Sequence, residues 1–257
     1  MYKIASLIRL AAGFAAVIAM QMPLPASAAL KPNLMFCGSS WRVGANLYAA
    51  TGPFTEVTGC APTATTQALL ITRSGTIAGN GAAWLAYLNA GGNIITEWNV
   101  AAAVYNEIYG TAYTNGAGFG QCADNAMPQV KLNPTDPFWV ANPIPVTPSG
   151  QGGCGYSLNT LVAGQPSVTA LGADLSGAIS FARRAQGAGL LYLLEADWQD
   201  PPPASFTSDS KTFMGALIIS SGTATSVPIP TLSQWGMIIL SGLMVLGALI
   251  VIRRQRG

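Results

Sequence analysis

An uncharged apolar segment near the C-terminus constrains this 257-residue chain more than any other feature. Residues 236 to 252 read GMIILSGLMVLGALIVI, and their only polar side chain is Ser241. As a helix the segment reaches about 26 Å, the short end of what spans a bilayer. A helix packed on a soluble domain normally keeps a polar face, which this one lacks. We therefore expect a single transmembrane helix, stopped by the basic tail 253–257 with Arg253, Arg254 and Arg256.

The N-terminus has the three-part layout of a secretory signal peptide. Lys3 and Arg9 make its start positive, residues 10 to 20 (LAAGFAAVIAM) are apolar, and Ala26-Ser27-Ala28 supplies a small-x-small site. A run of about 11 apolar residues is too short to span a ~30 Å hydrocarbon core. We expect residues 1–28 to be a signal peptide that is cleaved after Ala28, leaving an exported body at 29–226.

Composition excludes several classes of function for that body. Only 9% of the chain is charged, and there is no histidine, so Ser-His-Asp or Cys-His catalysis and a His-ligated zinc are excluded. The two ends hold five of the 12 basic residues and none of the 10 acidic ones, so the body is net negative. Its only basic doublet is Arg183-Arg184, which predicts no nucleic-acid partner.

All four cysteines fall inside the body, at positions Cys37, Cys60, Cys122 and Cys154. An even count in an oxidising compartment predicts two disulfides, for which three connectivities are possible. We favour Cys37–Cys60 and Cys122–Cys154, because closing the nearest pairs costs the least loop entropy. No CxxC is present, so a redox or zinc role is not indicated.

Short apolar runs alternate with helix-like periodic runs along the body. The predicted strands are 33–37, 68–72, 93–97, 178–182 and 189–194, and the predicted helices are 82–88, 99–109 and 208–220. Asn99 is the expected N-cap of the second helix. Residues 110–166 are rich in Gly, Asn and Pro and predict a long disulfide-tied insertion with short strands. This alternation predicts an α/β three-layer sandwich with a mostly parallel, flavodoxin-like sheet.

The string IPTLSQWG, followed by one apolar helix and an arginine-rich end, resembles the IPTL-CTERM protein-sorting domain of Gram-negative bacteria. The resemblance implies export across the inner membrane and single-pass anchoring in the lipid bilayer with the body on the periplasmic side. It further implies processing of the tail 227–257 by an exosortase-type membrane protease, and a final location at the cell surface or outside the cell. The residues that match the recognised element are Ile229, Pro230, Thr231, Leu232, Trp235 and Gly236.

The order of the predicted strands and helices in the body is similar to that of the class I glutamine-amidotransferase-like superfamily. The similarity rests on LAYLNAGGNIITEW, on the later GAGLLYLLEADWQD and on a terminal helix. In catalytic members of that superfamily a cysteine sits on a sharp turn after the central strand. Here that turn falls near residues 96–99 and has no Cys or Ser. The resemblance therefore implies a member without amidotransferase activity.

Four carboxylates follow predicted strands, where ligands of parallel α/β sheets bind: Glu97, Glu195, Asp197 and Asp200. With Trp98 and Trp198 beside them they are candidates for holding a saccharide or peptide, for calcium, or for acid–base hydrolysis. The alternative is that they cap loops or pair with arginines, namely Arg42, Arg73, Arg183 or Arg184.

We therefore expect a non-catalytic surface or matrix protein that binds a ligand or is structural. Exopolysaccharide is a candidate partner, and the alternative is a secreted carboxylate-dependent hydrolase acting on glycans or peptides. The glycines of residues 75–81 lack both GxGxxG and the lysine of a P-loop, so they predict a flexible connector and no phosphate-binding site. No cofactor and no metal are expected.

Overall fold

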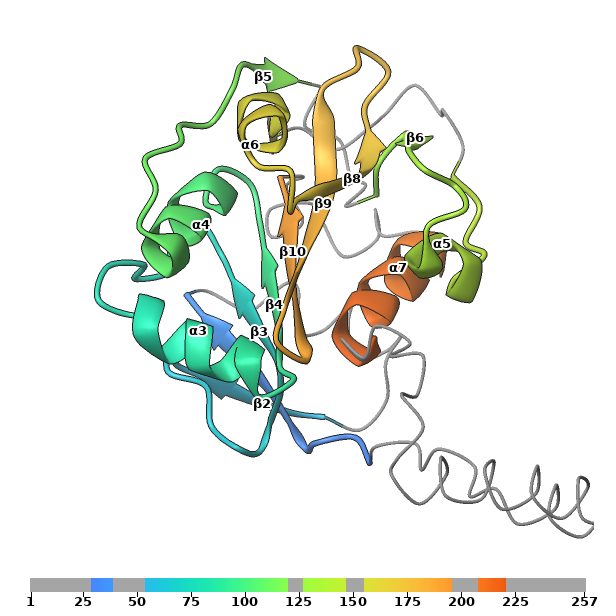
Figure 1. Cartoon of the computed structure of the whole chain (residues 1–257). Coiled ribbons are helices and arrows are strands. Elements are labelled where there is room, and N and C mark those ends of the chain that lie inside the picture. Colours follow the sequence, from blue (N-terminus) through green and yellow to red (C-terminus); the bar gives the residue numbers. More distant parts are fainter. Residues whose placement is uncertain (1–28, 39–53, 120–126, 147–154, 196–207, 221–257) are drawn as a thin grey trace, which may run out of the picture. The chain divides into compact units, whose positions relative to one another are not determined.

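The computed structural model describes residues 29–38, 54–119, 127–146, 155–195 and 208–220 (Figure 1). Residues 1–30 and 31–257 are separate compact units, and the fold given below is that of the described part of the second unit. The predicted signal peptide, transmembrane helix and basic tail lie outside the described residues. Within the described ranges, no helix is long and apolar enough to cross a membrane.

An eight-stranded sheet forms the centre of the body, in the order β2-β1-β3-β4-β10-β9-β8-β6. Four of its seven pairings, from β2 through β1, β3 and β4 to β10, are parallel, and the other three are antiparallel. The parallel part has the strand order 2-1-3-4-5 of a doubly wound sheet. The predicted α/β class with a mostly parallel sheet is confirmed. The strands are β1 Asn33–Cys37, β2 Thr55–Thr58, β3 Thr66–Ile71, β4 Asn93–Thr96, β6 Val130–Lys131, β8 Thr169–Ala173, β9 Ile179–Gln186 and β10 Gly189–Leu194.

Helices cover both faces of the sheet, and each face has its own apolar core. On one face α3 (Gly81–Asn89), α4 (Ala101–Tyr109) and α6 (Asn159–Gly164) pack against the sheet (Figure 1). On the other face lie α5 (Pro137–Ala141) and α7 (Ser208–Ile219). The inner strands are buried on both sides, which explains why their sequences are continuous apolar runs rather than alternating ones.

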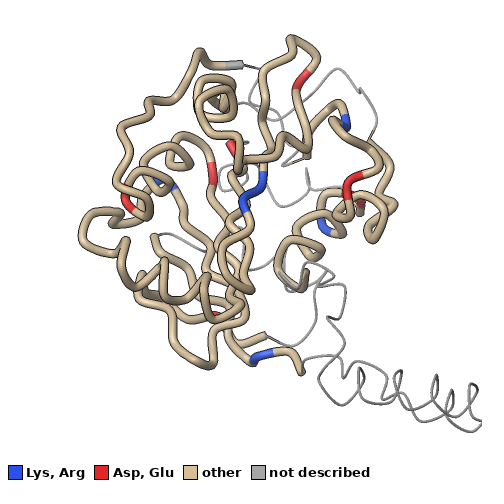
Figure 2. Tube along the Cα trace, viewed as in Figure 1, with Lys and Arg blue, Asp and Glu red and all other residues tan. Residues whose placement is uncertain are grey.

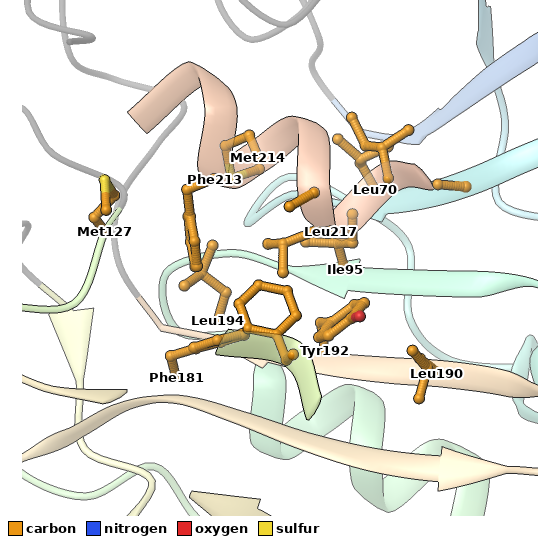
Figure 3. Packing of buried hydrophobic residues seen from close by; sticks show 14 of the residues in the cluster. Leu70, Ile95, Met127, Phe181, Leu190, Tyr192, Leu194, Phe213, Met214 and Leu217 are labelled. Carbon is orange, nitrogen blue, oxygen red and sulfur yellow. The ribbon is translucent and has the colours of Figure 1, made fainter. Parts of the chain in front are cut away.

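Among the fully buried side chains of α7 are Phe213, Met214 and Leu217, which belong to the apolar core on the α5–α7 face of the sheet. They point towards the sheet residues Phe181 and Tyr192 (Figure 3). The Phe213 ring meets Phe181 edge-on at a centroid distance of 5.1 Å. The helix predicted over residues 208–220 is therefore present as α7.

The ends of α3 and α4 are fixed by backbone groups rather than by their own side chains. Gly91, with φ 92°, ends α3, and Gly92 donates to the Tyr87 carbonyl at 2.9 Å. This is a Schellman-type C-terminus. The prediction that Asn99 is the N-cap of this helix is wrong, because α4 begins at Ala101 and no side chain caps it.

The predicted insertion at 110–166 contains more regular structure than its composition indicates. Its described parts form a two-stranded sheet of β5 (Gly118–Phe119) and β7 (Gly155–Tyr156), together with β6 and the helices α5 and α6. The helices were not expected. Asp136 caps α5 by accepting from the Phe138 N–H at 2.8 Å, and Phe138 and Trp139 then enter the core. Tertiary burial thus stabilises a helix too short to form by propensity alone.

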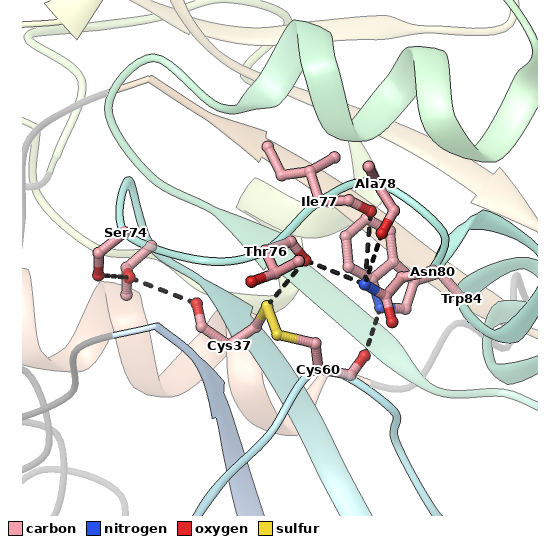
Figure 4. The surroundings of a disulfide bond; sticks show 9 residues. Cys37, Cys60, Ser74, Thr76, Ile77, Ala78, Asn80 and Trp84 are labelled. Atoms are coloured by element: carbon pink, nitrogen blue, oxygen red, sulfur yellow. Dashed lines mark hydrogen bonds between the residues drawn. A yellow bond between two sulfur atoms is a disulfide. The ribbon is translucent and has the colours of Figure 1, made fainter.

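The predicted disulfide Cys37–Cys60 is confirmed, with its Cα atoms 4.5 Å apart (Figure 4). It ties the end of β1 to the segment that follows β2. The indole N–H of Trp84 in α3 donates to the Cys60 carbonyl at 2.7 Å, so the bridge is also fixed to the helical layer. Cys122 and Cys154 lie outside the described residues.

Two amide side chains hold the end of α7 at the amino edge of the sheet. Asn93, at the start of β4, donates to the Leu217 carbonyl at 3.1 Å and also to the Ser220 carbonyl. Gln67 in β3 donates to the Ile218 carbonyl at 3.2 Å and accepts from the backbone N–H of Lys31 at 2.8 Å. The first and last described parts of the body therefore meet at this one edge.

Candidate functional site

The carboxyl ends of the parallel strands bring two predicted site residues to neighbouring positions. Glu97 directly follows β4, Glu195 directly follows β10, and these strands pair in parallel. Arg73 follows β3, the neighbour of β4 on its other side. Both glutamates are 0% exposed. This edge is where doubly wound sheets bind ligands.

Glu97 is held by Arg73. Its carboxylate accepts from the Arg73 backbone N–H at 2.7 Å, and its Oε1 lies 3.5 Å from the Arg73 Nε. One of the arginine pairings expected as an alternative role for these acids is therefore present. Of the other arginines considered, Arg183 pairs with Asp136 at 2.9 Å and Arg184 lies over the Tyr109 ring, while Arg42 is outside the described residues.

Glu195 is a buried acid whose two carboxyl oxygens have no hydrogen-bond partner in the described structure. Burial raises its pKa well above the ordinary value, and the charge of Glu97 raises it further. The backbone N–H groups of Ala101 and Tyr156 lie close enough to lower the pKa in part, although neither reaches hydrogen-bonding geometry. The protonated, neutral carboxyl is thus the favoured form.

Trp98 lies beside this acid pair in a left-handed backbone conformation, with φ 56°. It makes the sharp turn that carries the chain from β4 into α4. The Arg73 guanidinium lies 4.9 Å from the centroid of its ring, and Tyr156 meets that ring edge-on at 5.6 Å. The cluster consists of Arg73, Glu97, Trp98, Tyr156 and Glu195. Arg73, Trp98 and Tyr156 are half-buried, so the cluster reaches the surface through these three side chains.

Charged residues elsewhere on the described trace are few and scattered (Figure 2). In the described ranges, no group of three or more Asp, Glu or Cys residues could hold a metal ion. The site therefore offers two carboxyls, one guanidinium and two aromatic rings. Such a set can form hydrogen bonds and stack on a ligand.

Sequence reasoning placed Glu97, Glu195 and Trp98 at this edge but missed Tyr156. Tyr156 stands in a glycine-rich stretch with no periodic signal, and only the β5–β7 pairing places it against Trp98. The remaining candidates, Asp197, Asp200 and Trp198, lie outside the described residues. So do the sorting residues Ile229 to Gly236.

Comparison with known families identifies the C-terminal segment of the chain. Residues 227–256 match the IPTL-CTERM motif, so the chain carries the sorting tail of an exported protein. A search of curated proteins finds no match to the chain.

Proposed function

We propose that this chain is an exported bacterial protein, anchored by its C-terminal helix and then processed in its tail by an exosortase-type membrane protease. The single observation that carries the proposal is the IPTL-CTERM match at residues 227–256. The resemblance of residues 1–28 to a signal peptide supports export. The Cys37–Cys60 bridge supports it as well, since structural disulfides persist in oxidising compartments.

The chemistry of the motif explains how a protease in the membrane can accept it. Pro228 and Pro230 disfavour helix at and before their positions, and we propose that the protease meets the segment in an extended form just outside the apolar run. Trp235 then suits the membrane interface. An extended strand next to a bilayer is accessible to an enzyme that works at that surface.

For the body, we propose a flavodoxin-like, glutamine-amidotransferase-like domain that binds a ligand or has a structural role without catalysing a reaction. The strand order β2-β1-β3-β4-β10 and the sharp turn after β4 support this assignment. At that turn a tryptophan stands where a nucleophile would be needed. Both glutamates are 0% exposed and Glu97 is engaged by Arg73, which argues against carboxylate-dependent hydrolysis.

Processing is tested by the double variant Pro230→Ala with Trp235→Ala, expressed in a host that has the protease. We expect the full-length chain to stay in the membrane fraction, because the recognised element has lost its extended shape and its interfacial anchor. Immunoblots of membrane and medium fractions measure this. The matched control Ser233→Ala changes a residue of the same string outside the recognised set and should be processed normally. Release of the double variant at the parent rate would refute the proposal.

A further inference from the structure

Trp98 has the backbone conformation that suits its residue type least. Among the described residues only two non-glycine residues have positive φ, Asn133 at 49° and Trp98 at 56°. Asparagine tolerates this region, whereas a bulky side chain there is a genuine outlier. Strained residues of this kind persist where the surrounding structure holds them, and they gather at functional sites. Here the turn is held by Glu97, whose carbonyl accepts from the Val100 N–H at 3.2 Å.

The side chain of Trp98 also differs from the tryptophans of the core. The indole N–H groups of Trp84 and Trp139 donate to backbone carbonyls at 2.7 and 2.9 Å, and both side chains are buried. Trp98 is half-buried, and no such bond is present for its N–H in the described structure. Within the described residues, its ring contacts Arg73 and Tyr156. The Trp98 ring therefore offers an aromatic surface in a fixed position, and its indole N–H can donate a hydrogen bond to a ligand.

Glu195 adds an unpartnered polar group to the same cluster. It is 0% exposed, and its carboxyl oxygens lack hydrogen bonds to the described residues. The backbone of Tyr156, whose ring contacts Trp98, lies against this carboxyl. Leaving a buried carboxyl without partners costs stability, and buried groups of this kind gather at functional sites.

We infer that this edge of the sheet binds a saccharide, with Trp98 as the stacking surface and Tyr156 and Arg73 beside it. The inference rests on the proposed binding role of the body and names the class of its ligand. An indole face stacks on the C–H face of a sugar ring, while the guanidinium and the indole N–H donate hydrogen bonds to its hydroxyls. No basic cluster is present on the described residues to attract a polyanion such as nucleic acid (Figure 2).

The test uses the full chain, purified in a detergent without a sugar headgroup. Titration calorimetry with three probes, the hexamers of β-1,4-glucose, of N-acetylglucosamine and of mannuronate, distinguishes neutral from acidic saccharides. We expect at least one probe to bind and Trp98→Ala to weaken its binding about ten-fold or more. Trp98→Gly should lose binding equally while unfolding at a higher temperature than Trp98→Ala, since glycine accepts positive φ without strain. This second variant separates a lost ligand contact from a lost fold.

Val140→Ala is the matched control, because Val140 is 67% exposed on α5, outside the cluster, and should bind as the parent does. The inference is overturned if none of the three probes binds at millimolar concentration. Unchanged affinity in Trp98→Ala would overturn it too, as would binding of polypeptides alone. Tail processing of Trp98→Ala should match the parent in every case, so a failure here remains distinct from a failure of the sorting proposal.

Discussion

Glu195 combines two opposing influences on a single carboxyl group. It lies near the backbone N–H of Ala101, the first residue of α4, where a negative charge is favoured. Yet it is fully buried next to Glu97, where a negative charge is disfavoured. Burial is the larger effect, so the pKa of Glu195 is raised. The folded state therefore binds a proton more tightly than the unfolded chain does.

A raised carboxyl pKa fixes the sign of one pH effect on stability. Between the ordinary pKa of about 4.5 and the raised folded value, folding takes up a proton, so the free energy of unfolding falls as pH rises. We expect Glu195→Gln to remove this contribution: its stability should match that of the parent near pH 4 and exceed it increasingly towards neutral pH. Urea unfolding of both chains from pH 4 to 8 measures the difference.

Glu56→Gln is the matched control for that experiment, because it makes the same carboxyl-to-amide change at an exposed position of β2. A constant offset between parent and Glu195→Gln at all pH values would contradict the assignment of a raised pKa.

The sequence could predict where Glu97 and Glu195 lie, but not how they are partnered. Their position follows from two apolar runs that each end in an acid, and from the rule that parallel strands end at one edge. The sequence indicated four arginines as possible partners of these acids and could not single out Arg73. The positive φ of Trp98 could not be predicted from the sequence, because the residue types next to it do not favour that conformation. The conformation is stabilised by contacts with the surrounding structure.

At the scale of elements, the end of α7 depends on a residue from β4. Asn93 is 2% exposed, and its amide donates to carbonyls that a helix end otherwise leaves unpaired. We expect Asn93→Ala to cost about 1–3 kcal/mol of unfolding free energy, since it leaves those carbonyls buried without donors. Chemical unfolding measures the loss, and hydrogen exchange should show it as faster exchange in the last turn of α7.

Asn99→Ala is the control for that variant. Asn99 is exposed and makes no capping bond, so its replacement should leave stability within about 0.5 kcal/mol of the parent. An equal loss in both variants would contradict the role assigned to Asn93.

Elements with marked apolar runs were predictable, and several short elements outside such runs were not. The β9–β10 hairpin and α7 follow directly from their apolar patterns. By contrast, β2 has the sequence TEVT with mostly exposed side chains and becomes a strand only because it pairs with β1. Helix α5 is equally short, and it depends on the Asp136 cap and on burial of Phe138 and Trp139.

At the scale of the whole molecule, the described body begins and ends at the edge of the sheet opposite its candidate site. Gln67 contacts both Lys31 and Ile218 at the amino edge, whereas Glu97, Trp98 and Glu195 follow the carboxyl ends of their strands. A tail attached after Ser220 therefore leaves the candidate site on the far edge from its attachment. This arrangement is compatible with a body that binds a ligand before and after its tail is processed.

The same arrangement sets where the tail can be removed. Phe213, Met214 and Leu217 are each 0% exposed, and burying each such side chain contributes about 1.5–3 kcal/mol. Their sum is comparable with the total stability of an ordinary domain, about 5–15 kcal/mol.

We expect a chain ending at residue 226 to keep a cooperative thermal transition within about 2 °C of the full-length chain, because α7 and its contacts with Asn93 and Gln67 are intact. A chain ending at residue 207 should lack that transition and its near-UV circular dichroism, so processing that preserves the body must cut after Ser220. Loss of folding at 226, or an unchanged transition at 207, would contradict this boundary.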